Sequence, residues 1–214
     1  DDLIFNFNRI GIVSYDAGGA NILNCLVKKF DNIEFSLLID GPAKKIFDCI
    51  NATFFYNSSL FFNHVDFIIF GTGNTSYEKK LLRQAKDDHI PTVTILEHFV
   101  NFRQRFIYKD KICFPDYCFV CDEEAFDIAK RDLYPYSKIS ICDNFYIDSV
   151  KKYLGDRPNM TSNKVLYILE NIDEDWGRIP AWSIAFNNFY KNFFIKNKNL
   201  QHIIVRPHPK DNSD

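Results

Sequence analysis

Residues 10–21 read IGIVSYDAGGAN, an apolar run that leads directly into a turn with paired glycines. Beyond the turn, apolar residues recur at helical spacing as Ala20, Leu23, Leu26 and Val27. A strand, a glycine turn and a helix follow one another here, and the start of such a helix offers free N–H groups to an anion. The glycine spacing differs from the G-x-G-x-x-G fingerprint, so it does not predict a dinucleotide site.

The same alternation continues to about residue 150. Further strands are predicted at 33–39, 53–56, 67–70, 91–96, 117–121 and 139–142. Helices are predicted between them at 42–50, 77–88, from 122 onward and at 147–154. Near-continuous apolar strands separated by helices indicate a parallel sheet covered on both faces. We therefore predict an α/β fold with a doubly wound, Rossmann-like domain over residues 8–155.

A polar, turn-rich segment at 155–163 predicts a linker. After it, a strand at 164–169, an aromatic helix at 180–196 and a strand at 201–205 restart the pattern. Two strands and one helix bury too little surface to stand alone. We expect residues 164–214 to be the beginning of a second Rossmann-like domain, incomplete in this chain.

Composition limits the partners of the protein. The net charge of the 214 residues is −2, so no global field attracts nucleic acid, and no nucleic-acid partner is expected. The sequence contains no apolar run of ~20 residues and no signal-peptide pattern, which predicts a cytoplasmic protein and leaves peripheral contact with the membrane open.

The six cysteines lie in apolar segments and are expected to be reduced thiols. Cys118 and Cys121 form a C-x-x-C pattern, but within a strand this spacing directs the two sulfur atoms to opposite faces. No cluster has metal-ligand spacing, so we expect no metal and no cofactor.

Four predicted strands end in residues that can carry chemistry, and in a parallel sheet these ends share one edge. At the first, Asp16 is a candidate catalytic base and the neighbouring Gly18, Gly19 and Asn21 are candidate substrate contacts. The alternative is a tight turn in which Asp16 caps the helix. At the second, Gly71, Thr72 and Gly73 either contact the ligand or form a turn before a helix capped by Ser76.

The third strand end carries Glu97 and His98, a carboxylate beside an imidazole that could act as an acid–base pair. Because adjacent strand residues point in opposite directions, we expect one of them to reach the site and favour His98. The following FVNFRQRF segment adds Asn101, Arg103 and Arg105 as contacts for an anionic sugar or phosphate, and the arginines share a face if the segment is extended. The alternative is a structural histidine and surface arginines.

The fourth strand end lies in residues 203–211, which read IIVRPHPKD. Arg206 can bind a phosphate bidentately, and His208 and Lys210 follow it within four residues. The two prolines stiffen the turn. We predict a site for a phosphate ester here.

This RPHP run is similar to the HP element of GT-B glycosyltransferases that build bacterial capsule and lipopolysaccharide, and residues 96–106 resemble a motif of surface-polysaccharide proteins. The resemblance implies a nucleotide-sugar donor, CMP-, CDP- or UDP-linked, and a glycan or lipid-linked acceptor. It also implies that His208 contacts the donor phosphate, with Arg206 as helper.

We therefore expect a GT-B-type glycosyltransferase of surface polysaccharide, in which Asp16 or His98 deprotonates the acceptor and residues 8–155 form the acceptor side. Two alternatives stay open. One is a nucleotide-sugar epimerase or hydrolase of the same fold, and the other is a non-catalytic module that binds a glycan or an assembly complex. The sequence does not predict the oligomeric state.

Overall fold

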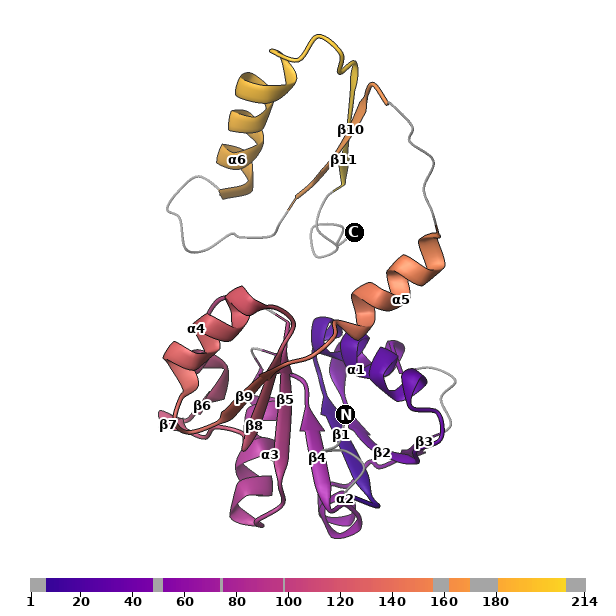
Figure 1. Ribbon diagram of the computed structural model, residues 1–214, viewed down its shortest axis with the longest axis vertical. Coiled ribbons are helices and arrows are strands. Elements are labelled where there is room, and N and C mark those ends of the chain that lie inside the picture. Colours follow the sequence, from indigo (N-terminus) through magenta and orange to yellow (C-terminus); the bar gives the residue numbers. More distant parts are fainter. Residues whose placement is uncertain are drawn as a thin grey trace. The chain divides into compact units, whose positions relative to one another are not determined.

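The computed structural model describes residues 7–47, 52–73, 75–97, 99–155, 162–169 and 181–206. The chain divides into two compact units, Asp1–Gly155 and Asp156–Asp214 (Figure 1). Within the described residues, no helix has the length and apolarity needed to cross a lipid bilayer.

The first unit is built on a seven-stranded sheet in the order β3-β2-β1-β4-β5-β8-β9, with every neighbouring pair parallel. Its strands are β1 (Ile10–Ser14), β2 (Phe35–Ile39), β3 (Ala52–Phe54), β4 (Phe67–Phe70), β5 (Thr92–Leu96), β8 (Tyr117–Val120) and β9 (Lys138–Ile141). The strand order reverses between β1 and β4, which is the switch point where open α/β sheets bind ligands, at the carboxyl ends of the strands. We call this edge of the sheet the carboxyl edge. The predicted doubly wound, Rossmann-like fold is confirmed.

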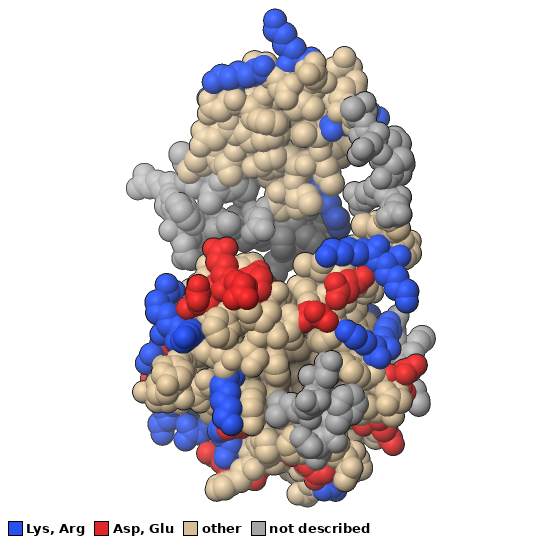
Figure 2. Space-filling model, viewed as in Figure 1, with Lys and Arg blue, Asp and Glu red and all other residues tan. Residues whose placement is uncertain are grey.

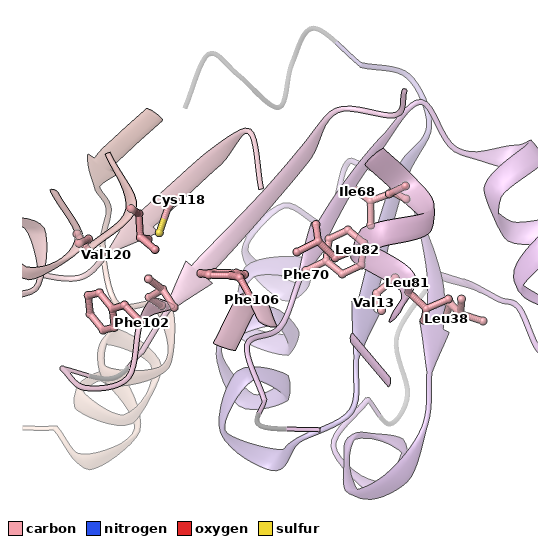
Figure 3. Packing of buried hydrophobic residues seen from close by; sticks show 14 of the residues in the cluster. Val13, Leu38, Ile68, Phe70, Leu81, Leu82, Phe102, Phe106, Cys118 and Val120 are labelled. Carbon is pink, nitrogen blue, oxygen red and sulfur yellow. The ribbon is translucent and has the colours of Figure 1, made fainter. Parts of the chain in front are cut away.

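Helices cover both faces of the sheet because successive strand residues point to opposite sides. Ile12 and Ile95 face α1 (Ala17–Lys29) and Phe145, the first residue of α5 (Phe145–Leu154). Val13, Phe70 and Leu96 face the other way and pack with α2 (Ser58–His64), α3 (Ser76–Asp87) and α4 (Glu123–Leu133); part of this cluster is shown in Figure 3. Fully buried strands account for the unbroken apolar runs in the sequence.

Several local elements differ from the sequence expectations. The pattern did not predict α2. In place of the helix expected at 42–50, the structure has a 3₁₀ turn, η2 (Gly41–Lys45). Residues 48–50 of the expected helix lie outside the described residues. Ser76 is the first residue of α3 rather than its cap, and Thr75 takes the cap position without a side-chain hydrogen bond.

The segment after β5 is compact rather than extended. It contains the 3₁₀ turn η3 (Arg103–Phe106) and a small hairpin of β6 (Ile107–Tyr108) and β7 (Lys111–Ile112). Phe102 and Phe106 are buried in the core beside α3 and α4, and Figure 3 shows both rings. The two buried rings fix the position of Arg103 and Arg105, which lie between them in the sequence.

The second unit contains two parallel strands, β10 (Lys164–Ile168) and β11 (His202–Arg206), joined through α6 (Ala181–Phe189) and a short π-helical turn, η4 (Tyr190–Phe194). Tyr167 packs its ring against Phe186 and Phe189 of α6, at centroid distances of 5.1 and 4.7 Å. On the other face, Leu166 and Ile168 remain more than half exposed. The prediction that a strand–helix–strand pattern begins again after residue 163 is confirmed.

Replacement of Phe67 in β4 by alanine tests the position of the core. Phe67 is fully buried and stacks on Phe7 at a centroid distance of 4.4 Å. We expect Phe67→Ala to lower the free energy of unfolding by about 3 to 5 kcal/mol, because the cavity adds to the lost burial. Urea unfolding measures this, with Tyr56→Ala, a ring 90% exposed, as the control. A loss no larger than that of the control would contradict the assignment.

Candidate functional site

The two glycine turns meet directly at the carboxyl edge. A Cβ atom on Gly19, in the first turn of α1, would lie 3.3 Å from the Cα atom of Gly71 and 3.4 Å from the backbone nitrogen of Thr72. The backbone that follows β1 therefore packs on the backbone that follows β4, with little room for a side chain. Glycine at position 19 permits this approach.

Glu78 of α3 connects the two turns through hydrogen bonds. Its Oε1 atom accepts a hydrogen bond from the backbone N–H of Tyr15, and its Oε2 atom accepts one from Gly73, both at 2.9 Å. The side chain is only 3% exposed. The pKa of Glu78 is raised to about 7, mainly by burial and in part by Asp16 and Glu97, while the two N–H donors oppose the shift.

Asp16 and Glu97 approach the same turns. A Cβ atom on Gly73 would overlap Oδ2 of Asp16 and would lie 2.6 Å from Oε2 of Glu78. A Cβ atom on Gly18 would overlap a carboxylate oxygen of Glu97 and would lie 2.9 Å from its Cδ atom. Three carboxylates, from the ends of β1 and β5 and from α3, therefore line the paired turns.

Asp16 does not act as the capping acid that the alternative interpretation proposed. It occupies the N-cap position of α1, but its side chain makes no capping hydrogen bond. Its backbone carbonyl accepts from the N–H of Ala20 at 3.0 Å. The carboxylate is therefore directed to the turn after β4 rather than to its own helix.

Arg105 supplies the positive charge of this site. Its Nη1 atom donates to the carbonyl oxygen of Thr72 at 2.5 Å, and among the described residues its buried Nε atom has no hydrogen-bond partner. Burial lowers the pKa of the guanidinium, while Glu97, Asp16 and Glu78 oppose that change. One guanidinium thus lies close to three carboxylates.

The expectation that Arg103 and Arg105 share a face is wrong. It assumed an extended segment, whereas η3 directs Arg105 toward the glycine turns and leaves Arg103 exposed, 6.0 Å from the ring centroid of Phe114. Asn101 is exposed, with a positive φ of 59°. Neither Asn101 nor Arg103 makes a described contact with the carboxylates.

The remaining predicted residues are distributed as follows. Thr72 is buried and donates its hydroxyl to the carbonyl of Ile95 at 3.4 Å, and Asn21 is half-buried in α1. Arg206 ends β11 in the second unit and is exposed. His98, His208 and Lys210 lie outside the described residues, so their roles stay predictions.

The other acids of this edge are surface groups. Asp122 caps α4 by accepting from the N–H of Ala125 at 2.8 Å, and Glu123 and Glu124, which follow it, are exposed. Acidic side chains gather at this end of α4 in Figure 2. In the part of the chain that the structure describes, no three acidic, histidine or cysteine side chains are arranged to hold a metal ion.

The sequence analysis did not identify Glu78. In the charged segment 76–87 it resembles any exposed acid, yet it falls on the same helical face as Leu81, Leu82 and Ala85, which are all buried. An acid at i, with apolar residues at i+3, i+4 and i+7, is directed toward the core. That spacing was the available signal.

Comparison with known proteins supports the fold and leaves the activity open. Neither a protein-family model nor a curated protein matches the sequence. A solved structure of UDP-N-acetylglucosamine 2-epimerase from Rickettsia bellii is similar, with a TM-score of 0.57 over 96% of this chain. The two chains are 13% identical, and the match covers 63% of the epimerase. The similarity is one of fold and supports a GT-B-like Rossmann fold.

Alanine substitutions at the two glycines of α1 should have opposite effects. Gly18→Ala is expected to keep or raise stability, by up to about 1 kcal/mol, because alanine favours the helix and the clash falls on the movable end of Glu97. It should nevertheless displace that carboxylate and impair ligand binding. In Gly19→Ala the new Cβ atom would press on backbone atoms of Gly71 and Thr72, which cannot move aside easily, so the melting temperature should fall. Equal melting temperatures for the two variants would contradict this packing.

The raised pKa of Glu78 predicts a pH-dependent stability. The folded state keeps the proton to about pH 7, whereas an ordinary glutamate in the unfolded chain releases it near pH 4.5. Between these values the folded state binds more protons, so raising the pH removes stability, by up to about 1.4 kcal/mol per pH unit. Urea unfolding of the wild type and of Glu78→Gln between pH 4.5 and 8 measures this. Parallel pH profiles for the two proteins would refute it.

Proposed function

We propose that this chain belongs to an enzyme that acts on a nucleotide-linked sugar and that carboxylates of the first unit move protons at the sugar. The observation that supports this most is the position of Asp16 and Glu97 against the glycine turns at the switch point of the sheet. Half-buried carboxylates at the switch point of an open α/β sheet, where such folds bind ligands, are candidates for acid–base chemistry.

The charge balance of this edge favours a sugar over a phosphate as its ligand. Asp16, Glu97 and Glu78 all interact electrostatically with the single guanidinium of Arg105, and even with Glu78 protonated the remaining acids outnumber it, so a phosphate dianion would meet repulsion there. A neutral sugar ring offers hydroxyl groups to the carboxylates and to the unpartnered Nε atom of Arg105. Arg206, His208 and Lys210 of the second unit stay candidate phosphate contacts, as the sequence predicts.

Two reactions share this chemistry. Epimerisation or hydrolysis needs the sugar nucleotide but no acceptor. The similarity in fold to a UDP-N-acetylglucosamine 2-epimerase favours this reaction. The presence of several carboxylates that can donate and accept protons favours it as well. Glycosyl transfer needs one base and an acceptor hydroxyl, and the RPHP run favours it. We place the acceptor-independent reaction first and transfer second.

The roles of the carboxylates follow from their surroundings. Glu97 and Asp16 lie at the glycine turns and are the candidate proton-transfer groups. Glu78 lies deeper, with both oxygens occupied by backbone donors, and acts as a positioning residue that holds the two turns together. His98 follows Glu97 directly in the sequence and stays a second candidate base.

Incubation of the purified protein with CMP-, CDP- and UDP-linked sugars separates the alternatives. Turnover without an acceptor supports epimerisation or hydrolysis, and turnover only with an oligosaccharide acceptor supports transfer. Binding without turnover in either mixture would support the non-catalytic module and contradict the enzymatic proposal.

Glu97→Gln tests the proposed chemistry in the protein itself. We expect kcat to fall by at least about 100-fold, since the amide cannot take up a proton, while KM and the melting temperature change little. Steady-state kinetics with the accepted sugar nucleotide measure this. Glu124→Gln, which alters an exposed acid of α4, is the matched control and should keep full activity. Equal activity of the two variants would remove Glu97 from the mechanism.

A further inference from the structure

A pair of thiols lies next to Glu97 on the carboxyl edge. The register pairs Leu96 of β5 with Val120 of β8, and Val120 with Ile141 of β9. One residue further along each strand come Glu97, Cys121 and Cys142, which form a row across three neighbouring strands. The sequence analysis ruled out Cys118 and Cys121 as a pair because they point to opposite faces of the strand, whereas the fold brings Cys121 next to a cysteine 21 positions later.

The two side chains lie beside each other on neighbouring strands. The backbone N–H of Cys142 donates to the carbonyl of Val120 at 2.8 Å, which places Cys142 next to Cys121, and interaction with the Cys142 thiol lowers the pKa of the Cys121 thiol. Both cysteines are free and half-buried. Cα atoms on neighbouring strands are separated by about 4.8 Å, which lies within the range of about 4.4 to 6.8 Å that a disulfide spans.

We propose that Cys121 and Cys142 form an oxidative modification site, a reactive thiol pair that hydrogen peroxide converts into a disulfide across the carboxyl ends of β8 and β9. This inference depends on the geometry of the pair and not on the proposed function.

The chemistry proceeds in two steps. The Cys121 thiolate attacks one oxygen of the peroxide; an S–O bond forms, the O–O bond breaks, and hydroxide leaves as water after protonation. Cys142 then attacks the sulfur of the sulfenic acid: the S–S bond forms, the S–O bond breaks, and the hydroxyl group leaves with the Cys142 thiol proton as a second water. The two thiols supply the two electrons that reduce one peroxide to two waters.

The environment favours Cys121 as the attacking group. The hydrogen bond from Cys142 lowers the pKa of the Cys121 thiol, against the opposing effects of burial and of the nearby Asp122 and Glu97. The same contact raises the pKa of Cys142, and burial adds to that effect. Cys118, by contrast, is fully buried in the apolar core, where burial raises its pKa and protects it.

Peroxide treatment of the native protein, followed by alkylation and peptide mapping, tests the proposal. We expect the mass of the chain to fall by two hydrogens, the new cross-link to join residues 121 and 142, and dithiothreitol to restore both thiols. In Cys142→Ser, dimedone should label Cys121 at a rate about ten-fold above that of Cys113. Cys113→Ser is the matched control and should keep the cross-link.

Two outcomes would overturn the proposal: a disulfide that joins other cysteines in the native wild type, or oxidation of Cys121 no faster than that of Cys113. The mapping of the wild type needs no substitution, so it decides the question even if a serine variant does not fold. A protein that forms this disulfide but turns over no sugar nucleotide would contradict the proposed function alone.

Discussion

The carboxyl edge of the first unit depends on one buried carboxylate. Glu78, which is buried, accepts backbone hydrogen bonds from the turn after β1 and from the turn after β4. Each N–H would otherwise be buried without a partner, at a cost of about 1 to 3 kcal/mol. The close contact between Gly19 and Gly71, and the positions of Asp16 and Glu97, follow from this connection.

The sequence predicts the central strands β1, β2, β4 and β5 well because they are buried on both faces. Segments such as 67–70 carry an unbroken apolar signal, and the glycine turns after 15 and 70 mark where these strands end. The ends of β1, β4 and β5 meet at one edge because these strands are parallel neighbours in one sheet. The prediction that the strand end at Arg206 shares this edge is wrong, because β11 belongs to the separate two-stranded sheet of the second unit.

The details of the site were harder to predict, for physical reasons. Arg103 and Arg105 alternate in the sequence, but burial of Phe102 and Phe106 folds this segment into a 3₁₀ turn that separates them. Glu78 was missed because a charged residue on an otherwise apolar helix face is identified only when its backbone partners are known. The same limit applies to Cys121 and Cys142, which the register of β8 and β9 brings together.

The central claim is that a sugar reacts at the carboxyl edge, between the glycine turns and Glu97. A crystal structure of the protein with a bound sugar nucleotide tests this most directly. The account predicts a sugar ring whose hydroxyl groups lie within hydrogen-bond distance of Glu97, Asp16 and Arg105. A sugar bound instead in the surface pocket lined by Lys86, Asp116 and Tyr136, at the amino ends of β5 and β8, would contradict it.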